Sequence, residues 1–156
     1  MKLHVLTVRH VGEYSSQFFA SDEFIRRHLE ILNHNPTNTH IVRKFNDYMI
    51  YKTNLNKDFY ETFVLNPAGI IAASSNENNI GKIEFGVDYF TYGKEGPYVK
   101  DVYMDENTGE YSLAFAAPIL KKRSGKFLGV LVIRFNANKL NEITTGKRSG
   151  IKEDTG

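Results

Sequence analysis

The stretch FYETFVLNPAGIIAA, residues 59–73, decides the fold class of this chain. Its first seven residues are rich in aromatic and β-branched side chains, which favour a strand. NPAG at 66–69 is a tight-turn sequence, because Pro67 fixes one backbone angle and Gly69 accepts a positive one. Residues 70–73 then return as a second strand. The stretch therefore predicts a β-hairpin.

Three further strands are predicted downstream of the hairpin, at residues 98–104, 111–119 and 127–135. Polar turns join them, DENTG at 105–109 and KKRSGK at 121–126. A hairpin followed by three strands with such short connections favours one antiparallel sheet of five strands.

The connection between hairpin and meander, residues 74–97, is long for a compact domain, and loops of this length are usually functional or disordered. Its aromatic content argues against disorder. We expect a short helix at 88–92 and a loop that caps one face of the sheet. The aromatic residues concerned are Phe85, Tyr89, Phe90, Tyr92 and, at the start of the next strand, Tyr98.

The first third of the chain predicts helices that cover the other face of the sheet, since a lone sheet must bury its apolar side. Gly12 and the pair at 15–16 weaken the first helical pattern, so a kink or break is expected there. Ser21 is expected to cap the next segment, and another helix should begin near Thr39. A short closing helix is expected at 137–143. Apolar residues recur at helical spacing: Val8, Val11, Phe18, Ile25, Leu29, Leu32, Ile41, Phe45 and Met49.

The composition excludes several classes of protein. The net charge is +2, from 20 basic and 18 acidic residues, and gives no reason to expect a nucleic-acid partner. The basic run at 121–126 is interpreted as a solvated turn, because no aromatic residues interleave with it. No window holds the roughly 18 consecutive apolar residues of a membrane helix. The chain has no cysteine, which excludes disulfides and cysteine nucleophiles.

No recognised catalytic or metal-binding motif is present. The five histidines, all within the first 40 residues, show no HExxH spacing. There is no G-x-S-x-G elbow, and GKRS at 146–149 lacks the earlier glycine of a phosphate loop because Asn141 stands in its place. We therefore expect a chain that is not an enzyme, with no catalytic residue, no metal and no cofactor.

Six short motifs follow one another between residues 66 and 140. They are NPAGIIAAS (66–74), NIGK (79–82), DYF (88–90), YVKDVY with NTG (98–103, 107–109), AAPI with GKFLGVL (116–119, 125–131) and NANKL (136–140). In this order they resemble the hairpin, loop, pocket helix and closing strands of Cache domains, the PAS-like extracytoplasmic sensor domains. The resemblance covers roughly residues 18–145.

The resemblance implies an α+β, PAS-like fold, a five-stranded antiparallel sheet with N-terminal helices packed on one face and a pocket-capping loop on the other. Residues 1–56 are then the helical region, 57–145 the sensing core and 146–156 a truncated linker toward a second lobe. We expect the first lobe of a double Cache receptor. The family also implies flanking membrane helices, so we interpret the chain as an excised piece of a membrane-anchored protein.

The resemblance also locates a ligand pocket between loop and sheet. Successive strand residues point to opposite faces, so Lys100 and Asp101 cannot both point inward, and the family pattern favours Asp101 as an acceptor for a ligand amine. The alternative for Asp101 is a lysine partner or a turn cap, and for the aromatic residues it is core packing. The expected ligand-binding residues are Tyr89, Phe90, Tyr92, Tyr98, Asp101, Tyr103 and Phe115.

One departure from the family pattern concerns the ligand. Amino-acid-binding Cache domains carry an Arg and a Trp just before the pocket Tyr, whereas EFGVD at 84–88 has neither. The usual guanidinium clamp for a carboxylate is missing, and Lys82, Lys94 or Lys100 would replace it with poorer bidentate geometry. The sequence does not name the ligand.

The leading functional hypothesis is an extracytoplasmic small-molecule sensor of a membrane signal-transduction receptor, with a histidine kinase as the favoured parent and a chemoreceptor next. The alternative is a PAS-like interaction module without a ligand, which forms a homodimer through the N-terminal helix. A small enzyme is the third hypothesis, and it would need convergent titratable groups that the sequence does not show.

Overall fold

The computed structural model describes residues 2–137, with side chains from residue 8 onward. The predicted closing helix at 137–143 and the linker at 146–156 therefore lie essentially outside the described residues. The elements, in chain order, are α1 (Lys2–Ala20), α2 (Glu23–His34), α3 (Thr39–Thr53), β1 (Phe59–Leu65), β2 (Ile71–Ser74), the 3-10 helix η1 (Glu77–Asn79), α4 (Asp88–Thr91), β3 (Tyr98–Asp105), β4 (Glu110–Leu120) and β5 (Phe127–Asn136).

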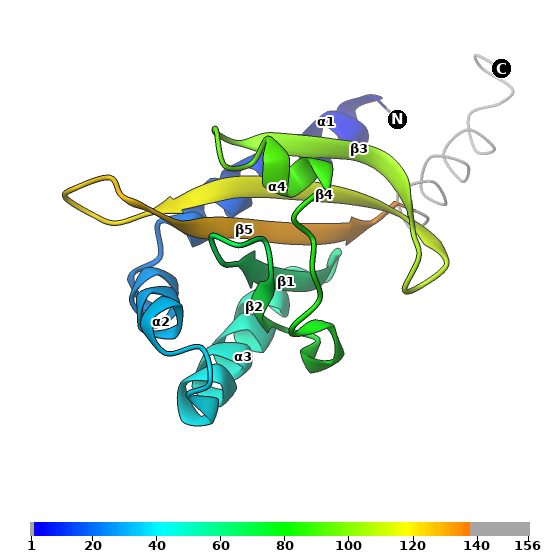
Figure 1. Ribbon diagram of the computed structural model, residues 1–156. Coiled ribbons are helices and arrows are strands. Elements are labelled where there is room, and N and C mark those ends of the chain that lie inside the picture. Colours follow the sequence, from blue (N-terminus) through cyan, green and yellow to red (C-terminus); the bar gives the residue numbers. More distant parts are fainter. Residues whose placement is uncertain (1, 138–156) are drawn as a thin grey trace, which may run out of the picture.

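The strands form one antiparallel sheet in the order β2-β1-β5-β4-β3, so that the last of the described strands, β5, is the central one (Figure 1). The predicted α+β, PAS-like architecture is confirmed. The predicted turn between the first two strands is present as well. Gly69 has a φ of 78°, and the Asn66 carboxamide oxygen accepts hydrogen bonds from the backbone N–H groups of Ala68 and Ile70, both at 3.0 Å.

Two hydrophobic cores lie on opposite faces of the sheet, because side chains alternate along each strand. The helix-side core joins α1, α2 and α3 to residues such as Phe115, Leu131 and Phe135. The loop-side core joins α4 to Phe63, Val132 and their neighbours. Figure 1 shows α1 and α4 on opposite sides of the sheet. Strands β4 and β5 are buried on both faces for most of their length.

The break between the first two helices lies at residues 21–22 and not near Gly12, so the predicted kink is wrong. Helix α1 runs without interruption past Gly12, whose missing side chain lets the helix lie directly against the Phe115 ring of β4. Helix propensity alone suggested that Gly12 breaks the helix, whereas the structure shows that close packing requires a glycine there.

The cap of α2 is Asp22, and the expectation of Ser21 is wrong. The Asp22 carboxylate accepts a hydrogen bond from the Ile25 backbone N–H at 3.1 Å, whereas the Ser21 hydroxyl donates back to the Phe18 carbonyl. The same carboxylate accepts from the Tyr48 hydroxyl at 2.5 Å and pairs with the Lys52 ammonium at 3.1 Å. Asp22 thereby fixes α2 against α3. Helix α3 begins at Thr39 as predicted, with Asn38 as its cap.

Substitution Gly12→Ala is expected to lower the free energy of unfolding by about 1 kcal/mol. A Cβ at this position would overlap the buried Phe115 ring, an overpacking cost of about 1–3 kcal/mol, which outweighs the gain of about 1 kcal/mol in helix propensity. Urea denaturation measures the change. The matched control is Gly96→Ala, where a Cβ meets nothing within 4 Å. Equal stabilities of the two variants would contradict the close packing of α1 on β4.

Candidate functional site

Two β-bulges aim polar side chains at the loop side of the sheet. In β1 the register shifts between Phe59 and Glu61, and both Tyr60 and Glu61 reach partners on the loop side. In β3 the register shifts between Lys100 and Tyr103. Without this shift, alternation would place Lys100 and Tyr103 on opposite faces. Because of it, both residues lie beside the same cavity.

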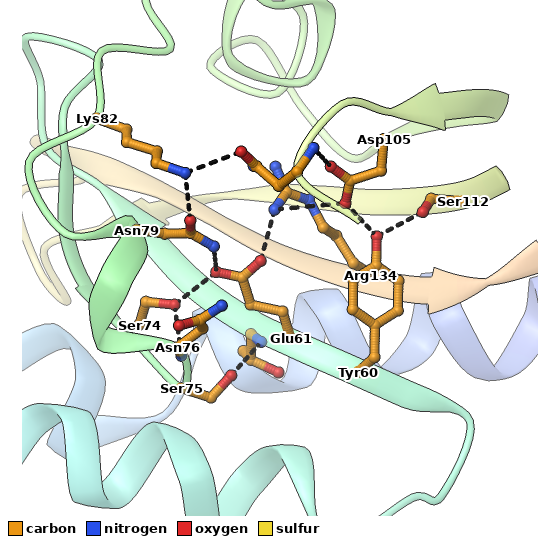
Figure 2. A network of polar contacts seen from close by, with 12 residues as sticks. Tyr60, Glu61, Ser74, Ser75, Asn76, Asn79, Lys82, Asp105, Ser112 and Arg134 are labelled. Carbon is orange, nitrogen blue, oxygen red and sulfur yellow. Dashed lines mark hydrogen bonds and ion pairs between the residues drawn. The ribbon is translucent and has the colours of Figure 1, made fainter. Parts of the chain in front are cut away.

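The centre of the site is a buried ion pair between neighbouring strands. The Arg134 guanidinium of β5 donates to the Glu61 carboxylate of β1 at 2.5 Å, and the two side chains are 4% and 3% exposed. Asp105 lies 4.0 Å from the same guanidinium nitrogen. Figure 2 shows Arg134, Glu61 and Asp105 pointing toward one another from three strands.

The Glu61 carboxylate also holds the start of the capping loop. Its second oxygen accepts hydrogen bonds from the Ser74 hydroxyl at 2.6 Å and from the Asn79 carboxamide at 2.8 Å (Figure 2). The Lys82 ammonium donates to Asn79 at 2.6 Å and to Asn107 at 2.9 Å. Lys82 therefore ties the loop to the turn between β3 and β4.

A second branch of the network fixes Asp105 at the end of β3. The Tyr60 hydroxyl donates to the Asp105 carboxylate at 2.7 Å and also lies 2.5 Å from the Ser112 hydroxyl. The other carboxylate oxygen of Asp105 accepts the Asn107 backbone N–H at 2.9 Å. Burial raises the pKa of the Tyr60 hydroxyl, so this phenol stays protonated and can donate.

Tyr89 and Glu84 connect the loop to the buried arginine. The Tyr89 hydroxyl donates to Glu84 at 2.7 Å and accepts from Arg134 at 2.9 Å, while Arg134 and Glu84 lie 3.4 Å apart. Burial raises the pKa of Tyr89. Burial alone would lower the pKa of Arg134, but the oxygens around it, first those of Tyr89 and Glu61, raise that pKa above its ordinary value. Arg134 therefore stays charged.

A cavity of about 490 Å³ lies over this network, within the size range of small-molecule sites. Two residues of its wall, Arg134 and Tyr103, lie close to each other, and the Tyr103 hydroxyl interacts with the Arg134 guanidinium. The wall consists of Lys82, Ile83, Glu84, Val87, Tyr89, Lys100, Tyr103, Met104, Asp105, Glu106, Asn107 and Arg134.

A larger cleft, of about 1120 Å³, separates α3 from the loop after β2. Its wall includes Arg43, Asp47 and Glu77. The smaller cavity, in contrast, has Tyr89, Asp105 and Arg134 of the buried polar network in its wall. The smaller cavity is therefore the better candidate site.

The structure brings some of the sequence-predicted site residues together and separates others. Tyr89 and Tyr103 line the cavity. Phe90 is fully buried in the loop-side core. Tyr92 and Tyr98 pack on each other with ring centroids 5.2 Å apart and are absent from the cavity wall.

Asp101 and Phe115 lie away from the cavity, contrary to the orientation expected for them. The Asp101 side chain is 73% exposed and pairs with Arg9 of α1 at 2.7 Å, while Lys100 lines the cavity. The alternation argument was correct, but the choice between the two residues was reversed. Phe115 belongs to the helix-side core, where its ring packs on Phe135.

The central residues Arg134 and Glu61 were absent from the sequence-based prediction. A signal existed, because each is the only charged residue in its mainly apolar strand, FLGVLVIRFN for Arg134 and FYETFVL for Glu61. Charged residues in strands buried on both faces are almost always paired. Pairing the two residues, however, requires knowing which strands are neighbours in the sheet.

Substitution Arg134→Met is expected to lower the free energy of unfolding by about 3–5 kcal/mol, because it leaves the Glu61 carboxylate buried without its partner. Adding Glu61→Gln should restore part of the loss. Urea denaturation measures all variants. The control is Arg9→Met, which breaks an exposed pair and should cost less than about 1 kcal/mol. A loss in Arg134→Met no larger than in the control would contradict the central role of this pair.

Within the described residues, no helix has the length and apolar content required to cross a membrane. The same residues contain no cluster of three or more histidine, cysteine or carboxylate side chains placed to hold a metal ion.

No protein-family model and no curated protein matches this chain. Solved structures do. The sensor domain of the histidine kinase DctB from V. cholerae superposes with a TM-score of 0.74 at 18% identity, over 86% of this chain and 51% of that one. The E. coli DcuS sensor domain superposes with a TM-score of 0.62 at 16% identity, over 85% of this chain and 91% of that one. The sensory domain of the Campylobacter jejuni chemoreceptor Tlp3 with isoleucine bound superposes with a TM-score of 0.61 at 14% identity, over 89% of this chain and 54% of that one.

The chain thus spans about half the length of the DctB and Tlp3 sensor domains and most of the length of the DcuS domain. At these identities the comparison establishes the fold. The resemblance to Cache domains is confirmed at that level, and the chain has the fold of the extracytoplasmic sensor domains of bacterial receptors.

Proposed function

We propose that this chain is the extracytoplasmic small-molecule-sensing domain of a membrane receptor, and that its ligand binds in the cavity over Arg134. The observation that carries the proposal is a cavity of about 490 Å³ whose wall contains Arg134, Tyr89 and Tyr103 of the buried polar network. A cavity of this size with a few convergent polar groups is the usual form of a small-molecule site.

Binding without conversion is the chemistry that the wall supports. The lining residues include no serine, threonine, cysteine or histidine, the usual nucleophiles and bases of hydrolytic sites. The lining carboxylates of Glu84 and Asp105 accept hydrogen bonds from neighbouring tyrosines. Such groups position a ligand, and we therefore propose no catalytic role for this domain.

Strand β3 offers a physical route from the ligand to the helices. Lys100 lines the cavity, and the next residue, Asp101, pairs with Arg9 of α1 on the other face. A ligand that prefers one position of β3 would therefore bias the position of α1. The shift is limited by the difference in affinity of the ligand for the two positions. We propose that α1 carries the signal toward the membrane.

The parent protein that we propose is a membrane-anchored sensor histidine kinase, with a chemoreceptor as the second possibility. Both classes occur among the structural neighbours, in DctB and Tlp3. The chain covers 51% of the DctB sensor domain and 91% of the DcuS sensor domain, so it has the size of one sensor lobe, and we propose that it is the first lobe of a double sensor. Residues 57–145 would then be the sensing core, with 1–56 as its helical support and 146–156 leading toward the second lobe.

A screen of the 156-residue chain by thermal unfolding, against small carboxylates, amines and amino acids, tests this function. A ligand at about 100 times its Kd adds about 2.7 kcal/mol of stability, which raises Tm by about 5 °C or more in a chain of this size. Tyr103→Ala should abolish the shift, and Tyr51→Ala, an exposed residue of α3, should keep it. No stabilisation by any compound of the three classes would count against a sensor.

A homodimer is the second candidate, because α1 exposes two stacked aromatic rings. Tyr14 and Phe18 are 69% and 53% exposed, with ring centroids 5.8 Å apart. Exposed aromatic side chains are enriched in protein interfaces. Dimerisation through this helix would be compatible with ligand sensing, or it would be the sole function of an interaction module.

Analytical ultracentrifugation over a range of concentrations should reveal a dimer that the double substitution Tyr14→Ser/Phe18→Ser weakens at least about tenfold, as expected for loss of two aromatic anchors. The control Leu55→Ser removes an exposed apolar residue of the α3–β1 connection. A chain that stays monomeric at every concentration would exclude this dimer.

A further inference from the structure

The larger cleft, of about 1120 Å³, lies between two ordered walls at the β2 edge of the sheet. One wall is a face of helix α3, which packs against β1 and β2 (Figure 1). The other wall is the turn after β2, where the Asn76 carboxamide oxygen accepts the Asn78 N–H at 3.1 Å and caps η1. Hydrogen bonds of the chain itself order both walls, so a ligand would bind here with a reduced entropy cost.

The floor of the cleft presents one donor that no other residue uses. Asn46 of α3 is only 8% exposed, and its carboxamide oxygen accepts the Ser74 N–H at 3.0 Å. The oxygen alone can meet this N–H, so the hydrogen bond fixes which way the Nδ2 group points. No described residue accepts from Nδ2. Unlike the fully enclosed Thr62 hydroxyl, Nδ2 is open to the cleft and available to a ligand.

The strand edge beside the cleft is closed by the chain's own loop. The Ser75 N–H donates to the Thr62 carbonyl at 2.9 Å, and the Ser75 hydroxyl accepts the Thr62 N–H at 3.0 Å (Figure 2). Farther along β2, the Ile71 carbonyl accepts the Gly81 N–H at 2.8 Å, and the Ile71 N–H donates to the Lys82 carbonyl at 3.0 Å. A peptide that binds by strand addition needs such groups unpaired. The cleft therefore favours a ligand recognised through side chains.

The charged residues at the rim of the cleft carry both signs. Arg43 and Asp47 lie one turn apart on α3, and Glu77 belongs to the opposite wall, on η1. Their side chains are exposed and form no hydrogen bond or ion pair with another described residue. An anionic ligand would meet two carboxylates, and an ammonium group offers no acceptor to Asn46. A hydroxyl group both donates and accepts, so a neutral polyhydroxylated ligand suits all of these groups.

Apolar side chains line the cleft between the polar groups. Val42 and Ile50, about two turns apart on α3, share the wall with Pro36 and Ile80. A sugar ring presents C–H faces as well as hydroxyl groups, and these side chains would bury such a face. The cleft exceeds the roughly 300–1,000 Å³ of ordinary small-molecule sites, so it has room for more than one ring.

We infer that the cleft between α3 and η1 is a second binding site, which takes a short neutral oligosaccharide. Asn46 Nδ2 donates to a sugar oxygen at the floor, and the Asp47 and Glu77 carboxylates accept from sugar hydroxyls at the rim. Val42 and Ile50 contact the C–H faces of the rings. The site is separate from the smaller cavity and does not rest on the sensing function proposed for that cavity.

An NMR titration of the isotope-labelled 156-residue chain with cellobiose, maltotriose and N,N′-diacetylchitobiose tests the inference. At least one of these sugars is expected to shift the side-chain amide signals of Asn46 and the backbone signals of residues 74–78. The signals of Lys100 and Tyr103 in the smaller cavity should not move. The loss of the Asn46 side-chain signals in Asn46→Asp identifies them.

Two variants and a matched control locate the site. Asn46→Asp keeps an oxygen for the Ser74 N–H but replaces the donor by an acceptor, and should weaken sugar binding at least about tenfold. Glu77→Gln alters an exposed side chain, and should weaken binding at least about threefold because hydrogen bonds to charged groups are the stronger ones. The control Glu95→Gln, at an exposed glutamate outside the cleft wall, should bind as the parent chain does.

The same titration with putrescine, glucuronate and trialanine distinguishes other classes of ligand. If one of these moves the signals of the cleft and the neutral sugars do not, the ligand is a cation, an anion or a peptide, and the inference is wrong. It is equally wrong if none of the three sugars moves these signals up to its solubility limit. Sugar binding that Glu77→Gln and a folded Asn46→Asp both leave unchanged would place the sugar outside the cleft. None of these outcomes bears on the thermal screen of the smaller cavity.

Discussion

The buried ion pair between Arg134 and Glu61 is the interaction on which the rest of the site depends. It joins the central strand β5 to β1, and both side chains are almost completely buried. Removing two charges from water is costly unless their remaining hydrogen-bonding groups are satisfied. Ser74, Asn79 and Tyr89 supply those bonds. The need to satisfy the pair therefore fixes the loop that caps the sheet.

The same requirement shapes the cavity. Once Tyr89 is bound to Arg134, the loop segment that includes α4 and Glu84 is held over the loop-side core. The bulge in β3 brings Tyr103 to the same side as Arg134. The result is a polar floor beneath a more apolar opening. Such a floor orients a ligand by hydrogen bonding, while the opening contributes through burial of apolar surface.

Strand β3 gives the site its connection to the helices. As the edge strand it presents Lys100 to the cavity and Asp101 to α1. A strand paired on only one side can shift with less loss of hydrogen bonding than a central one. The structural neighbours keep this architecture at 14–18% identity. A fold of this kind can host unrelated functions, because function depends on the residues of the site.

The sequence by itself determined the five strands, the hairpin turn and the start of α3, because these follow from local periodicity and turn chemistry. The PAS-like class followed from the resemblance of its motifs to those of Cache domains. Tertiary structure alone decided which charged residues met. Arg134 and Glu61 are 73 positions apart and became partners only through the pairing of β5 with β1. Lys100 and Asp101 exchanged their expected roles, because strand alternation shows that two neighbours differ in direction and does not show which one faces the core. Gly12 was a helix breaker by propensity and a packing contact in three dimensions, since only the fold places Phe115 against it.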